Sequence, residues 1–387
     1  MPTIKPMAAA RSTDQWDAIV IGAGPAGAVA ARQLALLKKR VLLVDKARLP
    51  RDKVCGGCLG GAAIDVLASI GLGHILQECG GIPLTTFTLA NDGVVARIPI
   101  GHRVAVSRRT FDAALVRKAS RAGVTVDDQT NATIQAPSDE TARLVTLQHG
   151  SHETTVRAKV VLVATGLARC PAGYTTHVAA RSRVGLGALL GHPPCDLELS
   201  SLNMACSSQG YVGIAAIEGG RFDVAAAVDP HALAAAASPG RLIEDILRQS
   251  GFTPTIDLQR IRWHGTPLLT RCTTPLASHR CLLIGDAAGY VEPFTGEGIG
   301  WAMHSALLAV SLLTGSLDKW DPSIASHWQK LHRRAFDGRQ RSCRALTLML
   351  RVKSLRKLMM WGLRQMPLLS RPVVSRLDRP FASPILQ

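Results

Sequence analysis

The stretch Trp16-Asp-Ala-Ile-Val-Ile-Gly22-Ala-Gly-Pro-Ala-Gly27 decides how this chain begins to fold. Its apolar first half is typical of a buried strand, and the three glycines let such a strand turn sharply into a helix. The amide groups at the start of that helix can face a pyrophosphate. The pattern predicts a helix to about Leu37 and a second strand at Val41-Leu-Leu-Val44.

An acidic residue, Asp45, ends this second predicted strand twenty-one residues after Gly24. A carboxylate in that position can accept hydrogen bonds from the ribose of a bound nucleotide. Strand, glycine turn, helix, strand and acid in this order predict a dinucleotide site. A turn with a purely structural role is the alternative.

A second glycine-marked stretch, Gly285-Asp286-Ala-Ala-Gly-Tyr-Val-Glu-Pro-Phe-Thr-Gly-Glu-Gly298, lies more than two hundred and fifty residues further along the chain. It follows a short apolar strand, Cys281-Leu-Leu-Ile284, and leads through a proline- and glycine-rich turn into a long apolar helix. An acid followed by such a turn suits a ribityl chain and a flavin ring. The two stretches together therefore predict bound FAD.

Three further segments complete this expected cofactor lobe. Glycines follow Cys55, where they would let the backbone approach a ligand closely. Arg108 opens a predicted helix to about Ala122, where its guanidinium could meet phosphate. Val160-Val-Leu-Val-Ala164-Thr-Gly166 is typical of a buried parallel strand that ends in a small-residue turn.

The predicted fold class is α/β (α+β), with four segments along the chain. An FAD-binding domain is predicted from residues 14–166 and 277–320, which the chain would leave and re-enter. Residues 167–276 are predicted to form an inserted substrate-binding domain with a mixed β-sheet. Residues 321–387 are predicted to form a basic, helical C-terminal region.

The glycine motifs, together with Pro50-Arg-Asp-Lys-Val-Cys55-Gly-Gly57, Arg108-x-x-Phe-Asp112 and Ala164-Thr-Gly166, resemble a known family. It is the geranylgeranyl reductase branch of the para-hydroxybenzoate hydroxylase-like FAD-dependent oxidoreductases. The resemblance covers both ends of the first three hundred residues and leaves the middle unmatched. It implies a Rossmann-type FAD domain of the GR2/PHBH-like kind, with the flavin between that domain and a mixed-sheet lobe.

The resemblance also implies which residues contact the cofactor. The three glycines of the first motif would contact the pyrophosphate, Asp45 the adenosine ribose and Asp286 the ribityl hydroxyls. The turn before Gly298 would line the isoalloxazine, with the helix N-terminus directed at the ring. The implied cofactor-binding residues are Gly22, Gly24, Ala26, Gly27, Asp45, Lys46, Cys55, Gly56, Arg108, Thr165, Gly166, Gly285, Asp286, Pro293, Gly296, Gly298 and Ile299.

The reaction stays open between two classes. One is reduction of a C=C bond in a hydrophobic prenyl or lipid-like substrate, with electrons from NAD(P)H or a separate reductase. The other is hydroxylation of a phenol, quinone or polyketide-type aromatic by a flavin-dependent monooxygenase. Gly296-Glu-Gly298-Ile and Cys55-Gly-Gly57 resemble the reductases more, which favours reduction. Trp263-His-Gly does not reproduce the Trp-x-Trp motif of flavin halogenases.

No catalytic side chain is identified besides the flavin itself, although Cys55 is a candidate neighbour of the isoalloxazine. Cys55 and Cys58 could form the dithiol of a disulfide oxidoreductase, but the second nucleotide fingerprint of those enzymes is missing. A non-catalytic lipid carrier is a further alternative. The histidines and cysteines show no ligand spacing that predicts a metal site.

The formal net charge of +17 lies mainly near the C-terminus, where residues 328–379 hold fourteen Lys or Arg against two Asp. An apolar stripe at helical spacing is predicted there, with Lys353, Lys357 and Arg364 on the opposite face. The stripe consists of Leu348, Val352, Leu355, Met359, Leu363 and Met366. Such a helix packs its stripe on the protein's own core or docks on an anionic membrane. A nucleic-acid partner is not expected, because no recognition motif accompanies the charge.

Nine cysteines scattered through 387 residues do not resemble the framework of a small secreted protein. The first apolar run is too short for a signal peptide or a membrane span. A cytoplasmic location is therefore expected, with peripheral contact at the inner membrane face if the basic helix docks there. The oligomeric state is not predicted.

Overall fold

Parallel strands carry both glycine motifs to the same edge of one sheet. The computed structural model describes residues 15–137, 140–292, 294, 296–317, 320–366 and 370–381. Neighbouring pairs from β18 through β9, β1 and β2 to β6 are parallel. The eight strands of this first sheet are β17 (Ala277–Ser278), β18 (Cys281–Leu283), β9 (His152–Val163), β1 (Gln15–Ile21), β2 (Val41–Val44), β6 (Thr125–Asp127), β8 (Arg143–His149) and β7 (Thr130–Ile134).

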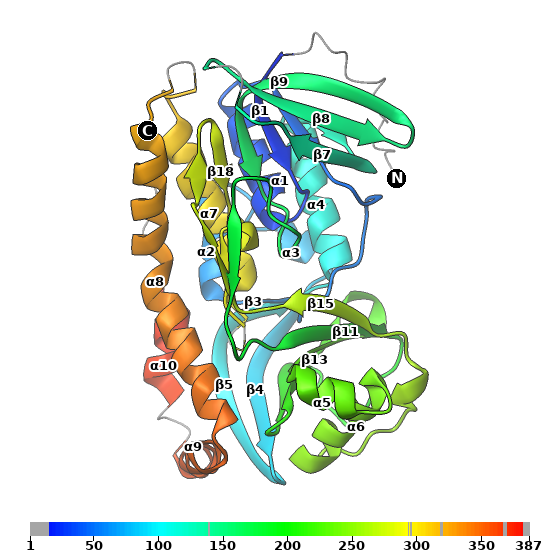
Figure 1. Ribbon diagram of the computed structural model, residues 1–387. Helices are drawn as coiled ribbons and strands as arrows, with labels where there is room; N and C mark the ends of the chain where they lie inside the picture. Colours follow the sequence, from blue (N-terminus) through cyan, green and yellow to red (C-terminus); the bar gives the residue numbers. More distant parts are fainter. Residues whose placement is uncertain are drawn as a thin grey trace.

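Strands β2 and β18 are apolar and buried along their length, as parallel strands covered on both faces must be. Helices α1 and α7 pack together beside these strands in the upper part of Figure 1. The helices of this lobe are α1 (Pro25–Leu36), α2 (Gly61–Ser69), α3 (Ile75–Glu78), α4 (Arg108–Arg121) and α7 (Gly298–Leu313). The expected strand, turn, helix and strand at the start of the chain are therefore present.

A second sheet lies below the first in Figure 1. Its eight strands, in spatial order, are β15 (His264–Leu268), β11 (Val184–Leu190), β14 (Arg221–Val228), β13 (Gly210–Ile217), β12 (Ser201–Cys206), β4 (Ile82–Asn91), β5 (Val94–Ala105) and β3 (Cys58–Leu59). The pairing is mixed, because β12 is parallel to β4 while the other neighbours are antiparallel. Helices α5 (Pro230–Ala235) and α6 (Pro239–Ser250) belong to this lobe.

The second sheet does not begin at residue 167, where the sequence pattern placed the boundary. β3, β4 and β5 come from residues 58–105, and they join this sheet because β4 pairs with β12 in parallel. The hairpin of β4 and β5, which turns at Asn91–Gly93, therefore extends the second sheet rather than the cofactor lobe. A pairing between residues more than a hundred positions apart leaves no trace in local sequence patterns.

A small third sheet and several short turns connect the two lobes. The three strands are β10 (Thr175–Val178), β16 (Arg271–Thr274) and β19 (Gly289–Tyr290). The short 3-10 helices are η1 (Glu218–Gly220), η2 (Leu258–Arg260) and η3 (Gly285–Ala287). Because β19 belongs to the second glycine motif, this sheet ties that motif to the strand leaving the second lobe.

The C-terminal region is helical, but it does not form the single amphipathic helix that the periodicity predicted. Helix α8 (Ser323–Arg351) runs along both lobes in Figure 1, and Val352 interrupts it with an extended ψ before α9 (Lys353–Gln365). Helix α10 (Arg371–Leu377) follows. The predicted stripe is a packing face only in part, because Leu348, Val352 and Leu355 are exposed while Met359 and Leu363 pack against the core. The inward face of α9 also carries Arg356 and Met360, both buried.

Candidate flavin site

The two glycine motifs follow parallel strands that end side by side. In the register of the first sheet, Ile21 lies beside both Val44 and Val163, and Val163 lies beside Leu283. The residues after these strand ends are therefore brought to one edge of the sheet. They are Gly22 after β1, Asp45 after β2, Ala164 to Gly166 after β9, and Gly285 shortly after β18.

The first glycine turn has no room for side chains. Gly22 has a φ of 108°, and a Cβ there would lie 2.4 Å from the carbonyl oxygen of Ala164. A Cβ on Gly27 would lie 1.8 Å from the carbonyl oxygen of Gly22. This close packing sets the start of α1 against the strand ends, and no described side chain caps the N-terminus at Gly24. Its amide groups can therefore face an anion.

The two motifs are in direct contact although they are far apart in sequence. A Cβ on Gly285, whose φ is 59°, would lie 2.9 Å from the Cβ of Ala26. The amide of Gly285 donates a 3.0 Å hydrogen bond to Ser305 Oγ of α7. The expectation that the two stretches form one site thus has a structural basis in this contact.

Asp45 is buried and held in place by backbone donors. Its Oδ2 accepts a 2.8 Å hydrogen bond from the amide of Ala23, and its Oδ1 accepts a 2.9 Å bond from the amide of Ala47. Arg51 lies 3.3 Å from the same carboxylate. Lys46, which the family resemblance placed at the cofactor, is exposed in the turn after β2.

Three cationic side chains converge on the glycine turn. A Cβ on Gly24 would lie 3.7 Å from Nη2 of Arg108 and 3.8 Å from Nη2 of Arg51, and one on Gly166 would lie 2.7 Å from Nζ of Lys53. Burial and the neighbouring Arg108 lower the pKa of Lys53. The sequence pattern did not identify Arg51 and Lys53 as cofactor-binding residues, although both lie in the Pro50–Gly57 segment.

Arg108 is fixed by an ion pair one helical turn away. Its Nε and Nη2 each donate a 2.8 Å hydrogen bond to the carboxylate of Asp112, so the pair is bidentate. Burial lowers the pKa of Arg108, but Asp112 and Cys55 raise it by more, so the guanidinium stays charged. Cys55, the predicted neighbour of the isoalloxazine, therefore lies beside Arg108.

The start of α4 is anchored to the second sheet by Glu218. This carboxylate accepts hydrogen bonds from the Ser107 amide at 2.9 Å and the Thr110 hydroxyl at 2.6 Å. Ser107 itself caps α4 by accepting from the Thr110 amide. Arg108 is consequently positioned by both lobes at once.

Asp286 lies in η3, at the start of the second glycine motif. Burial raises its pKa, and the nearby Lys53 and Arg108 lower it in part. Burial raises the pKa of Tyr290 too, and Asp286 and Cys55 act on Tyr290 in the same direction. Lys53, Cys55, Arg108, Asp286 and Tyr290 therefore influence one another electrostatically.

The second motif then turns toward α2. Gly296 has a φ of 73°, and a Cβ there would lie 3.8 Å from the Sγ of Cys58. Burial raises the pKa of the Cys58 thiol. Both Cys55 and Cys58, the two thiols of the possible dithiol, are free cysteines. Cys58 borders the turn between Glu292 and Glu297, called the flavin turn below. Pro293 lies outside the described residues.

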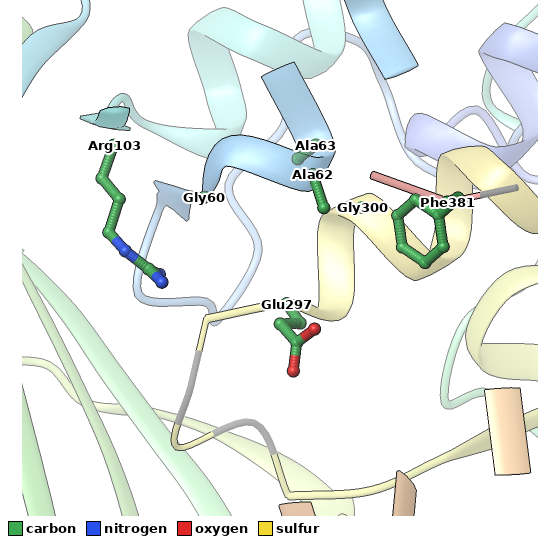
Figure 2. Close-up of a pocket in the computed structure, with 7 residues that line it drawn as sticks. All are labelled: Gly60, Ala62, Ala63, Arg103, Glu297, Gly300 and Phe381. Carbon is green, nitrogen blue, oxygen red and sulfur yellow. The ribbon is translucent and has the colours of Figure 1, made fainter. Parts of the chain in front are cut away.

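The N-terminal ends of α2 and α7 meet at a small pocket. Figure 2 shows Ala62 and Ala63 of α2 beside Gly300 of α7, with Arg103 and Phe381 on either side. A Cβ on Gly300 would lie 3.2 Å from the Cβ of Ala63. Helix α7 begins at Gly298, Ile299 is buried, and no described side chain caps this N-terminus. The positive end of the α7 dipole is therefore free to face a ligand.

Helix α8 holds both ends of the turn from Glu292 to Glu297. Arg339 pairs with Glu297 at 2.9 Å, and Arg351 lies 3.4 Å from Glu292. Glu292 is buried and also pairs at 2.8 Å with the equally buried Arg183 of the second lobe. Glu292 and Glu297 lie inside the second glycine motif, but their arginine partners lie far away in the sequence. No local sequence pattern could therefore identify these ion pairs.

The second sheet presents a mostly apolar face to this turn. Phe294 makes edge-to-face contacts with Tyr211 at 5.0 Å and with Phe87 at 6.0 Å between ring centroids. Asp223 of β14 is the polar exception, because its Oδ2 lies 2.9 Å from where a Cβ on Gly57 would stand. Burial raises the pKa of Asp223 to about 8, against the lowering effect of Arg108.

These residues fit FAD. Glycine turns that a Cβ would block leave backbone exposed for a pyrophosphate, and Arg51, Lys53 and Arg108 supply cations to neutralise it. Asp45 and Asp286 are the carboxylates that could accept hydrogen bonds from ribose and ribityl hydroxyls. The described residues contain no group of three or more metal-ligating side chains.

Comparison with known proteins supports an FAD-binding domain. A family model described as an FAD binding domain matches residues 15–195. Menaquinone reductase of Mycobacterium tuberculosis is 29% identical, over 78% of this chain and 77% of that protein. Digeranylgeranylglycerophospholipid reductase 2 of Methanococcoides burtonii is 26% identical, over 80% of this chain and 78% of that protein. Conditioned medium factor receptor 1 of Dictyostelium discoideum is 26% identical, over 80% of this chain and 66% of that protein.

Solved structures of flavoproteins share the fold. A flavin-dependent brominase superposes with a TM-score of 0.77 at 19% identity, covering 94% of each chain. The p-nitrophenol 4-monooxygenase of Pseudomonas putida also gives 0.77, at 13% identity, covering 95% of this chain and 99% of that one. These likenesses confirm the predicted fold class. None of the described helices has the length and apolar character to span a bilayer.

Proposed function

We propose that this protein, an FAD-dependent oxidoreductase, reduces a C=C bond in a hydrophobic prenyl or lipid-like substrate. The reductases among its relatives support this choice, since their names denote a quinone and a geranylgeranyl lipid as substrates. The observation that carries the proposal is the buried apolar cluster that packs against the flavin turn. Hydroxylation of an aromatic substrate is the competing reaction.

That cluster surrounds Phe294 and joins the flavin turn to the second sheet. Its buried members are Leu89, Ala96, Met204, Cys206, Tyr211, Ala227, Leu269, Phe294, Leu350 and Met360. Aliphatic, aromatic and thioether side chains of this kind recognise an apolar chain by area and shape. A small polar substrate would find few partners on them.

The buried carboxyl of Asp223 suits reduction as well. Saturating a C=C bond adds two hydrogen atoms, one of which arrives as a proton. Asp223 is buried beside Gly57, and its carboxyl keeps a proton up to about pH 8. Asp223 would therefore donate that proton from the face of the second sheet that lies beside Gly57.

Bound FAD would supply the electron-transfer chemistry, with NAD(P)H or a separate reductase proposed as the electron donor. The chain's own contribution is to hold and polarise the cofactor. The start of α7 would stabilise negative charge on a reduced ring through its dipole. The aromatic side chains around Phe294 would exclude water from the substrate side of the site.

The test is an anaerobic reaction of the FAD-loaded, chemically reduced protein with a geranylgeranyl lipid and with a prenylated quinone. Mass spectrometry with fragmentation should place a gain of two hydrogen atoms, without oxygen, on the prenyl chain, which distinguishes C=C reduction from conversion of the quinone ring to its quinol. A matched Asp223→Asn variant, with its flavin content checked, should form product more slowly and lose the wild-type pH dependence. A product that gains an oxygen atom, formed only after air is admitted, would reject reduction in favour of hydroxylation.

A further inference from the structure

Large apolar side chains are exposed together near the end of α8 and on α9. Thirteen such side chains are exposed among the described residues, and seven of them fall between 348 and 366, so they are not scattered over the surface. The seven are Leu348, Met349, Val352, Leu355, Leu358, Trp361 and Met366.

Three of these side chains form a row on the outer face of α9. Leu355, Leu358 and Trp361 repeat every three residues, and both Leu358 and Trp361 are 63% exposed. Residues at this spacing share one side of a helix. The opposite side carries Arg356 and Met360, which are 2% and 1% exposed. The outer row therefore points away from the protein's own core, and the helix is already packed without it.

Basic side chains flank this row, and α9 itself contains no acidic residue. Lys353, Lys357 and Arg364 are exposed on α9. No Asp or Glu occurs in the sequence between Asp337 and Asp378, whereas ten Lys or Arg do. The acid near them is Asp92 of the β4–β5 turn, 3.8 Å from Lys357, and both partners are more than a third exposed. Such an exposed pair neutralises little of the charge.

The helix lies where a flat surface could reach it. In Figure 1 α9 forms the lower end of the molecule together with the β4–β5 turn, while the β8–β9 hairpin lies at the opposite end. A planar partner could therefore contact α9 without meeting the cofactor lobe.

We propose that α9 docks this protein on an anionic lipid bilayer. Leu355, Leu358 and Trp361 would enter the boundary between headgroups and acyl chains, where Trp and Leu are favoured. Lys353, Lys357 and Arg364 would lie against anionic headgroups. A second copy of this chain is a poorer occupant, because a symmetric contact through this face would bring basic side chains together.

The inner side of α9 connects this docking with access of a lipid substrate to the site, a link that rests on the proposed function. Met360 belongs to the same apolar cluster as Phe294 of the flavin turn, and Met359 and Leu363 pack against that cluster. A bilayer under α9 would thus lie one helix away from the apolar cluster around Phe294, which is proposed to recognise the substrate. A lipid substrate would need to cross little water to reach it.

The test is co-sedimentation of the full-length, FAD-loaded protein with vesicles of phosphatidylcholine alone or mixed with phosphatidylglycerol. Binding should require the anionic lipid and weaken with added salt. A Leu358→Ser/Trp361→Ser variant should bind on the order of tenfold or more weakly. A Leu36→Ser/Leu37→Ser variant is the matched control, since both leucines are exposed on the other lobe. Flavin content and circular dichroism establish that each variant is folded.

Lipid exposure of Trp361 is a second readout that needs no turnover. Brominated lipids should quench part of the tryptophan emission in the wild-type protein and not in Trp361→Leu. Equal vesicle binding by the Leu358→Ser/Trp361→Ser variant would overturn the proposal. So would a concentration-dependent dimer that this variant abolishes, with no vesicle binding, because the face would then be a protein interface. Failure of the reductase assay in detergent would leave this docking result unaffected.

Discussion

Single residues of the flavin site are defined by what surrounds them as well as by their motif. Asp45 and Asp286 are both acids that follow a strand, but Asp45 is satisfied by two backbone amides, whereas Asp286 faces Lys53 and Arg108. Asp45 therefore shapes the turn itself. Asp286 is the acid whose partners can change when a cofactor binds.

Replacing Asp286 should weaken FAD binding without unfolding the protein. We expect Asp286→Ala to cost roughly 1–3 kcal/mol of FAD affinity, because hydrogen bonds from a buried carboxylate to the ribityl hydroxyls are lost. Flavin fluorescence titration of the apoprotein measures this. Asp52→Asn, in the nearby loop but half exposed, is the control. An unchanged dissociation constant in Asp286→Ala would remove this residue from the site.

The buried carboxyl of Asp223 should make stability depend on pH. Its pKa is 3.8 when unperturbed and about 8 in the folded protein, so the folded state binds the proton more tightly. Stability is therefore greatest at low pH with respect to this group and falls as pH rises through about 8. At about 1.4 kcal/mol per pKa unit, the loss is roughly 6 kcal/mol at most.

Urea denaturation of the wild-type protein and Asp223→Asn at about pH 5 and about pH 8 checks this sign. The amide cannot ionise, so the variant should gain stability relative to wild type as the pH rises. Parallel curves for the two proteins would mean that Asp223 is not a buried acid with a raised pKa.

At the scale of elements, the second glycine motif depends on helices outside it. Its turn is held by α8 through Arg339 and Arg351 and by the second lobe through Arg183. The pair of Arg183 and Glu292 is the most buried of these, with each side chain 2% exposed. The turn that would line the isoalloxazine is therefore stabilised by two different parts of the fold.

Breaking this pair from one side should be severe, and removing both charges should be milder. Arg183→Met leaves Glu292 with Arg351 as its remaining cation, and we expect a loss of about 3–5 kcal/mol in unfolding free energy. The double variant Arg183→Met/Glu292→Met should recover much of that loss, because the cation that loses Glu292 in it, Arg351, is partly exposed. Denaturant titration of wild type, both single variants and the double variant gives the coupling. Additive single effects would contradict the assigned pair.

Helix α9 shows why periodicity alone misassigned a face. The steps of three and four from Leu348 to Met366 are real, but they cross the break at Val352. After that break, packing against β4 and β5 selects Arg356 and Met360 as the inner residues. Arg356 is tolerated there because it donates to Asn91 Oδ1 and, at 2.8 Å, to the Leu350 carbonyl.

For the whole molecule, the C-terminal region is part of the folded core rather than an appendage. Leu350 and Met360 belong to the cluster around Phe294, Asp378 pairs with Arg103 at 3.0 Å, and Phe381 stacks on His304 at 4.3 Å between ring centroids. Deleting residues after Leu346 would remove all of these contacts. Such a truncation is a poor test of membrane docking.

We expect that truncation to destabilise the protein strongly and to reduce its FAD content. By contrast, Leu358→Ser/Trp361→Ser should stay within about 0.5–1 kcal/mol of wild type, because exposed positions contribute little to stability. Thermal unfolding with and without added FAD measures both effects, since a ligand that binds only the folded state raises the midpoint. A truncated protein with wild-type midpoint and flavin content would show that the C-terminal contacts are dispensable.

The amino-acid sequence by itself determined the strand ends and turns of the cofactor lobe. Glycines at 22 and 27, the acid at 45 and the turn after 285 stand at characteristic distances from the ends of apolar strands, so their pattern can be recognised without a structure. The resulting fold class and the FAD site follow from that local logic.

Only the tertiary structure decided what supports and surrounds the site. The transfer of residues 58–105 to the second sheet, the arginines that hold Glu292 and Glu297, and the outward row on α9 all depend on contacts between distant segments. Such contacts are chosen by competition for burial and by pairing of buried charges, which a linear pattern does not record.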